Sequence, residues 1–156
     1  MIGTSLKNHW LSQGIEVNPG ISKEELSAFE SKYQVSLPTD LRDYFQTVDG
    51  MADGFTDNAL IRFWSLNEVK PIPEEAPDFS DPSYIEEAES LFLFADYCIW
   101  SHAYAIRLSS TEASNPIIII GDETPSRIFD SFSELVSSYL TDAELLLSNI
   151  KESNED

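Results

Sequence analysis

Basic residues are scarce in this chain, since nine Lys and Arg stand against 28 Asp and Glu, a formal net charge of −19 at pH 7. Such a charge repels the phosphates of nucleic acids and of anionic membranes, so we expect no direct binding to either. It attracts basic proteins, although acidic composition also serves solubility alone. The charge balance leaves both interpretations open.

Cysteine and long apolar runs are scarce too. Cys98 is the single cysteine, which excludes an internal disulfide, and the two histidines belong to no cluster with zinc-ligand spacing. The longest apolar runs, such as residues 117–120, are far too short to span a bilayer. The first ten residues lack the apolar run of a signal peptide. We therefore expect a cytoplasmic protein that does not associate with membranes.

Catalytic motifs are lacking. The sequence contains no glycine-rich phosphate loop and no His-Glu-x-x-His helix. Cys98 and His102 are the best nucleophile and base that the chain offers. A reactive thiol needs a basic or positive environment, yet Asp96 lies two residues away and no Lys or Arg occurs between residues 70 and 107. We predict a buried cysteine, no catalytic residues and no cofactor.

One loop has part of a calcium-binding pattern. Asp49, Asp53 and Asp57 supply acidic side chains at a spacing that superficially resembles an EF-hand loop. However, Met51 occupies one ligand position, and Leu60 stands where the closing glutamate belongs. We expect a polar loop after a helix, without a metal.

Apolar and aromatic residues, in contrast, are plentiful. Hydrophobic residues make up 42% of the chain and include nine Phe, six Tyr and three Trp. This is enough for a globular interior, and the length suits one domain over residues 1–150. Residues 151–156 read as a frayed acidic tail.

Helix signals come first along the chain. A weak amphipathic stretch occupies about the first 14 residues, and Ser22 with Glu25 forms a capping box for a second helix. A third helix is predicted to start near Pro38. Its apolar stripe extends to Val48, and Asp49-Gly50 is expected to end it.

Strand signals are grouped in the middle. Short runs rich in aromatic and β-branched residues predict strands over residues 60–64, 91–94, 103–108, 116–120 and 128–129. Two further capping boxes, Ser131 with Glu134 and Thr141 with Glu144, predict C-terminal helices. Helices, then strands, then helices indicate an α+β fold with a mainly antiparallel sheet.

The stretch from Pro71 to Ile106 contains no Lys or Arg. Three apolar side chains that could anchor a partner, Phe79, Tyr84 and Ile85, lie among its acids. The acids that we consider for binding a basic partner are Glu74, Glu75, Asp78, Asp81, Glu86, Glu87 and Glu89. Charge would steer the encounter and buried aromatics would hold it. The alternative is a solvated acidic loop whose aromatics cover the core.

Several segments, in order, resemble the SUKH superfamily of Smi/Knr-type yeast cell-wall regulators and their bacterial relatives. Leu37-Pro38 opens an aromatic helix, Trp64 lies in a strand, and Phe132 follows the last strand. The similar segments are 37–45, 49–50, 63–69, 93–96, 104–106, 116–123 and 128–135. Asp49 stands where the family usually has asparagine, and residues 98–103 lack the glycine-rich turn often found there.

The resemblance implies a curved antiparallel sheet with N-terminal and C-terminal helices packed around it, and no enzymatic activity. Leu37, Pro38, Trp64 and Phe132 are then structural positions. Bacterial members are often immunity proteins that neutralise toxins, many of them nucleases, and other members are adaptor or regulatory domains. A toxin nuclease domain must be cationic to bind phosphates, which agrees with an acidic immunity protein. The oligomeric state is left open.

Overall fold

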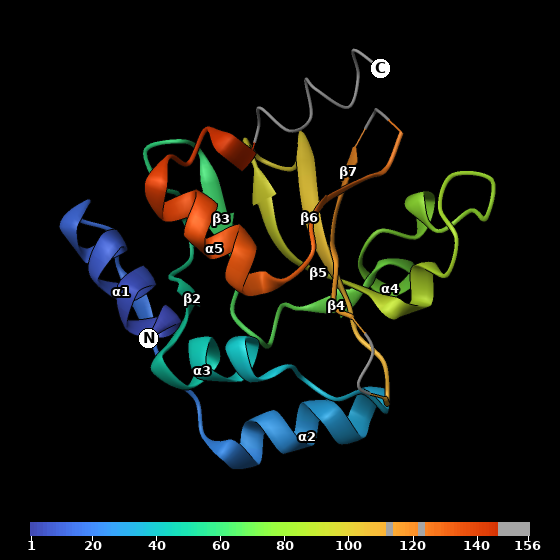
Figure 1. Cartoon of the computed structure of the whole chain (residues 1–156), viewed down its shortest axis with the longest axis horizontal. Coiled ribbons are helices and arrows are strands. Elements are labelled where there is room, and N and C mark those ends of the chain that lie inside the picture. The colour runs from blue at the N-terminus through green and yellow to red at the C-terminus, as the bar shows by residue number, and fades with distance from the viewer. Residues whose placement is uncertain (112–113, 122–123, 147–156) are drawn as a thin grey trace.

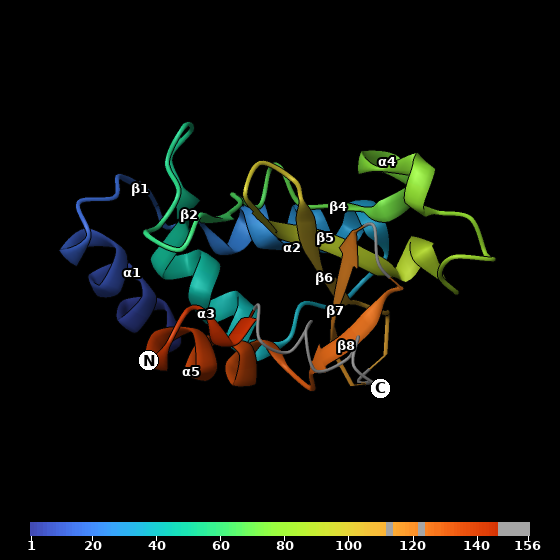
Figure 2. The ribbon, with the colours of Figure 1, turned by 90° about the horizontal axis from the view of Figure 1, so that it is seen from above.

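The computed structural model describes residues 1–111, 114–121 and 124–146. Its elements form an α+β fold in which helices pack around a mainly antiparallel sheet (Figure 1), as the sequence predicted. In two perpendicular views, helix α4 lies on the side of the sheet away from α5 (Figures 1 and 2). The proposed tail at 151–156 lies outside the described residues.

The N-terminal helices are α1 (Ile2–Ser12), α2 (Lys23–Tyr33) and α3 (Thr39–Thr47). The predicted cap of α2 is confirmed, because the Ser22 side chain accepts a hydrogen bond from the Glu25 backbone N–H at 3.2 Å. Pro38 is the N-cap of α3, and its fixed φ suits the start of a helix.

The predicted end of the third helix was wrong. The helix stops at Thr47, and the next residues form strand β2 (Val48–Met51), which pairs antiparallel with β1 (Val17–Pro19). Val48 is buried, but from a strand. Gly50 has a φ of +71°, and a Cβ there would lie 2.5 Å from the Trp64 carbonyl oxygen, so a glycine is required.

The main sheet contains six strands, all paired antiparallel. They are β3 (Ile61–Phe63), β4 (Lys70–Pro71), β5 (Leu91–Tyr97), β6 (His102–Arg107), β7 (Ile117–Gly121) and β8 (Ser126–Phe129). The order is β3-β5-β6-β7-β8, and β4 also pairs with β5. One extra residue in β5, opposite β6, and one in β8, opposite β7, interrupt the register, and bulges of this kind increase the bend and twist of a strand.

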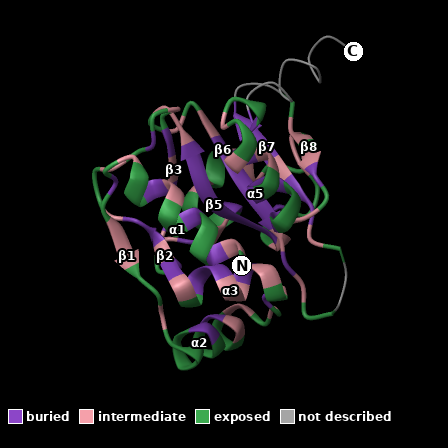
Figure 3. Ribbon diagram, turned by 60° about the vertical axis from the view of Figure 1, so that its left-hand side comes forward, coloured by how far each residue is buried: buried purple, intermediate pink, exposed green. Residues whose placement is uncertain are grey.

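Both faces of the sheet are buried. Side chains of successive strand residues point to opposite sides, so neighbouring residues of one strand belong to different apolar clusters. Phe92, Tyr104 and Ile119 belong to a main core covered by the helices, including α5 (Phe132–Thr141). Leu93 and Ala105 belong to a second cluster on the other face. Figure 3 shows the buried residues concentrated along β5, β6 and β7.

A buried polar network ties α1 and α5 to the loop before β3. Trp10 Nε1 donates to the Tyr139 hydroxyl at 2.9 Å, and this hydroxyl donates to Asp57 Oδ2. Asp57 Oδ1 accepts from the backbone N–H groups of Ala59 and Ile61, at 2.8 and 2.9 Å. Asp57 is 4% exposed, so its carboxylate links three chain segments inside the protein.

The four signature positions, Leu37, Pro38, Trp64 and Phe132, lie in the core or at the start of a helix. Leu37, Trp64 and Phe132 are buried, and Pro38 begins α3. Phe132 is the first residue of α5, whose predicted cap is confirmed because Ser131 accepts from the Glu134 N–H at 3.1 Å.

The cap predicted at Thr141 was wrong. Thr141 is the last residue of α5 and its hydroxyl donates to the Ser137 carbonyl. Asp142 accepts from the Glu144 N–H instead, at 3.0 Å. The turn after α5 is thus shifted by one residue relative to the capping box.

Candidate protein-binding surface

Residues 72–90, which we call the cover segment, lie over the second face of the sheet. They comprise α4 (Ile72–Glu75), η1 (Pro77–Phe79) and η2 (Ala88–Ser90), joined by turns. Pro77, two residues after the end of α4, and Pro82, three residues after the end of η1, prevent one long continuous helix. The acidic stretch that the sequence singled out is therefore a compact layer on the sheet and has only short helical turns.

The apolar side chains of the cover segment face the sheet. Ile72 is buried, while Phe79, Tyr84 and Ile85 are partly buried against the second cluster. The Tyr84 hydroxyl donates to the Gly121 carbonyl at 2.8 Å and accepts from the Gly121 N–H at 3.0 Å. The aromatics that the sequence suggested as partner anchors thus hold the segment onto β7 and its neighbours.

A row of aromatic rings links the cover segment to the β5–β6 hairpin. The rings of Phe79 and Trp100 stack with centroids 5.9 Å apart and planes 22° apart. Phe79 also lies 5.5 Å from Tyr84, and Trp100 lies 6.4 Å from Trp64. No local pattern in the sequence pointed to Trp100 in this role, since the contact joins residues far apart in the chain.

The acids of the cover segment face outward. All seven are exposed: Glu74, Glu75, Asp78, Asp81, Glu86, Glu87 and Glu89. Glu74 accepts from the Tyr33 hydroxyl at 3.3 Å, and Glu87 pairs with Arg107 at 2.8 Å. Hydrogen bonds from the backbone and hydroxyl of Ser83 hold the pKa of Asp81 below its usual value. The structure therefore leaves all seven predicted carboxylates accessible on the cover segment.

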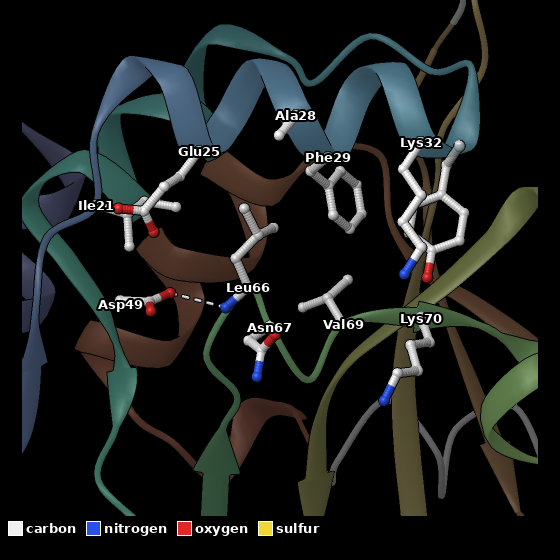
Figure 4. A pocket seen from close by; sticks show the side chains of 11 residues that line it. Ile21, Glu25, Ala28, Phe29, Lys32, Asp49, Leu66, Asn67, Val69 and Lys70 are labelled. Carbon is white, nitrogen blue, oxygen red and sulfur yellow. Dashed lines mark hydrogen bonds between the residues drawn. The ribbon is translucent and has the colours of Figure 1, made fainter.

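A groove of about 240 Å³ lies between α2 and residues 66–70 (Figure 4). Its walls include the apolar side chains of Phe29, Leu66 and Val69. Asp49 lies at one end, where one carboxylate oxygen accepts from the Leu66 N–H at 2.7 Å. Lys32 lies at the other end, close to Tyr33. Asp49 thereby fixes the turn that leads from Trp64 toward β4.

Replacing Asp49 with asparagine should stabilise the protein at neutral pH. Burial raises the pKa of Asp49, Glu25 and Glu68 raise it further, and the Leu66 N–H only partly offsets them. A carboxyl with a raised folded pKa contributes least above that pKa, because it must then lose a proton that folding favours. The asparagine amide would be neutral and would keep an oxygen for the Leu66 N–H. We expect a gain of roughly 0.5 kcal/mol for this half-exposed position.

The measurement is thermal unfolding of Asp49→Asn at several pH values. The gain should be present at pH 7, fade as the pH falls through the raised folded pKa of Asp49, and be gone below the unfolded value of about 3.9, where the aspartate is neutral in both states. Asp53→Asn is the control, because the Asp53 side chain is fully exposed. A gain that is the same at every pH would contradict this account.

The other residues weighed for chemistry are not assembled into a site. Cys98, predicted to be buried, is only partly buried in the turn between β5 and β6, whereas the His102 ring stacks on Tyr97 with centroids 5.9 Å apart. Asp57 is directed inward to backbone amides and Tyr139. Within the described ranges, no three His, Cys, Asp or Glu side chains are grouped as metal ligands.

The described part of the chain has no helix that is both long and apolar enough to cross a bilayer.

A search of curated proteins finds no match to this sequence. A family model, however, matches residues 20–138, which include the cover segment, Asp49 and the strands of the main sheet. That model describes the SMI1 / KNR4 family (SUKH-1), whose domains bind partner proteins and include immunity proteins. Because the match spans well over half of the residues, the chain belongs to the SMI1 / KNR4 (SUKH-1) family.

Proposed function

We propose that this protein is a cytoplasmic immunity protein that binds a basic toxin, such as a nuclease domain, through the acids of the cover segment. It acts by occupying the toxin's cationic surface and performs no catalysis. The observation that carries the proposal is the division of the cover segment into apolar side chains that face the sheet and seven exposed carboxylates that face solvent. Family membership supports a protein-binding role.

Electrostatics support this choice of partner. The chain carries a formal net charge of −19, and the whole stretch from Pro71 to Ile106 lacks Lys and Arg. A nuclease must present positive charge to bind phosphates. Facing such a surface, the cover segment speeds diffusional encounter, and salt screens the attraction. The protein thus recognises the positively charged surface that the toxin needs in order to bind phosphates.

Reversing two of these charges should slow association with the toxin domain encoded by the neighbouring open reading frame. Glu86 and Glu89 are the residues to change to lysine, because both are exposed. Glu87 is left intact, since it pairs with Arg107. We expect the association rate at low salt to fall roughly tenfold or more and to lose much of its salt dependence.

The control carries the same change in net charge elsewhere. Glu16 and Glu24 are exposed residues before α2 and in its first turn, outside the cover segment. Their double change to lysine should slow association far less. Surface plasmon resonance at several ionic strengths makes the comparison, with thermal unfolding as a check on folding.

Salt-independent association, or equal slowing by both double variants, would remove the cover segment from the interface. A neighbouring gene that encodes no toxin would favour an adaptor or regulatory role instead. In cells, co-expression should abolish the growth arrest that the toxin domain causes, and Glu86→Lys with Glu89→Lys should weaken this protection.

A further inference from the structure

The tip of the β5–β6 hairpin displays an isoleucine to solvent. Ile99 is 94% exposed, one of the few large apolar side chains of the described residues that are not covered. Leu60, 48% exposed, lies beside the hairpin, since its carbonyl accepts from the Cys98 N–H at 2.8 Å. Covering such a side chain with a partner would remove apolar surface from water, which favours association.

The backbone of this tip is strained. Cys98, Ile99 and Trp100 have φ values of 49°, 52° and 68°, and Leu60 has 67°. L-residues other than glycine and asparagine seldom adopt this left-handed region, and β-branched residues least of all. Glycine would relieve the strain, yet the chain has none here. Strain of this kind persists where the surroundings hold it and is concentrated at functional sites.

Four interactions hold the tip in this conformation. The Trp100 ring lies against Phe79 and Trp64, and the Trp100 N–H donates to Asp96 Oδ1 at 3.2 Å. The Ser101 N–H donates to the Tyr97 carbonyl at 2.9 Å. Ile99 is therefore presented on a fixed base, so that little conformational freedom is lost when a partner covers it.

The tip is continuous with the acidic surface. Trp100 stacks on Phe79, and Phe79 is preceded by Asp78 and followed, two residues on, by Asp81, both exposed. An apolar tip that contacts the acidic cover segment through Trp100 and Phe79 matches a partner surface in which an apolar pocket is bordered by Lys and Arg. This is the common arrangement of an interface, with an apolar centre and a charged rim.

We propose that Ile99 is the apolar anchor of the interface and inserts into a pocket with a basic rim on the toxin domain. This inference rests on the proposed function, because it names the same partner. Charge on the cover segment then governs how fast the two proteins meet, and Ile99 governs how long they stay together.

Ile99→Asn and Ile99→Gly test the anchor, since both residues tolerate the left-handed conformation. We expect each variant to have an unchanged or higher Tm, because strain is relieved and no buried contact is lost. The dissociation rate from the purified neighbouring toxin domain should nevertheless rise roughly thirtyfold or more, the size of a hot-spot loss. Association and its salt dependence should stay as in the parent protein.

Leu11→Asn is the control, because Leu11 is 50% exposed on α1, at the opposite end of the molecule from α4 (Figure 2). It should leave the dissociation rate unchanged. If charge reversal slows binding while both Ile99 variants dissociate at the parent rate, the anchor is overturned and the proposed function stands. If neither charge reversal nor Ile99 matters, or no toxin is encoded next door, both are overturned.

Discussion

Trp64→Ala should lower the free energy of unfolding by about 3–5 kcal/mol, as truncation of a large buried aromatic does. Trp64 is 4% exposed and belongs to the cluster beneath the cover segment. Its Nε1 donates to Asp96 Oδ2 at 2.7 Å, and Asp96 is itself 8% exposed. The substitution therefore opens a cavity and also removes a donor from a mostly buried carboxylate, which adds to the loss.

Urea unfolding followed by circular dichroism measures this loss. Trp64→Phe retains an aromatic ring and most of the volume while it removes the indole donor, so it should cost clearly less than alanine. Limited proteolysis gives an independent result: cleavage within residues 72–90 should accelerate in the alanine variant, because Trp64 is part of the surface on which that segment rests. A loss below about 1 kcal/mol would mean that the ring is not packed as described.

Asp57→Ala should lower the free energy of unfolding by about 3–4 kcal/mol. Hydrogen bonds to a charged acceptor contribute more than neutral ones, and buried donors left without an acceptor are costly. The Ile61 N–H and the Tyr139 hydroxyl are the buried donors affected. Because the carboxylate joins α5 to the loop before β3, the loss should affect global unfolding rather than one loop.

Asp53→Ala is the matched control for this change. Asp53 is an acid of the same loop, but its side chain is fully exposed and 3.5 Å from Arg62. It should shift the unfolding free energy by no more than about 0.5 kcal/mol. In a double-mutant cycle, Asp57→Ala and Tyr139→Phe should be strongly non-additive, since each removes the same hydrogen bond. If the two losses in unfolding free energy were additive, the hydrogen bond between Tyr139 and Asp57 would not contribute as described.

Local signals in the sequence located most of the elements. The caps at Ser22 and Ser131 depend on residues three positions away, and both formed as predicted. Val48 continues the helical stripe of α3 but lies in β2, because pairing with β1, about 30 residues earlier in the chain, decides its conformation. Thr141 had the spacing of a cap, yet Asp142, a competing acceptor one residue on, took that position.

The candidate site was predictable in its charge and not in its geometry. The absence of Lys and Arg marked the acidic stretch, and its carboxylates are exposed. The inward direction of Tyr84 depends on Gly121, 37 residues away, which no local pattern reveals. The left-handed conformation of Ile99 contradicts the preference of its residue type and is imposed by tertiary packing.

The two-sided construction of the cover segment also bears on how such a protein evolves. Side chains that secure the segment point to the sheet, and the carboxylates that we propose to select a partner are exposed. In the proposed interface, a mutation at an exposed position such as Glu86 or Glu89 would alter recognition with almost no effect on folding stability. Partner specificity could then change by single substitutions as the surface of the toxin changes, while each intermediate sequence still folds.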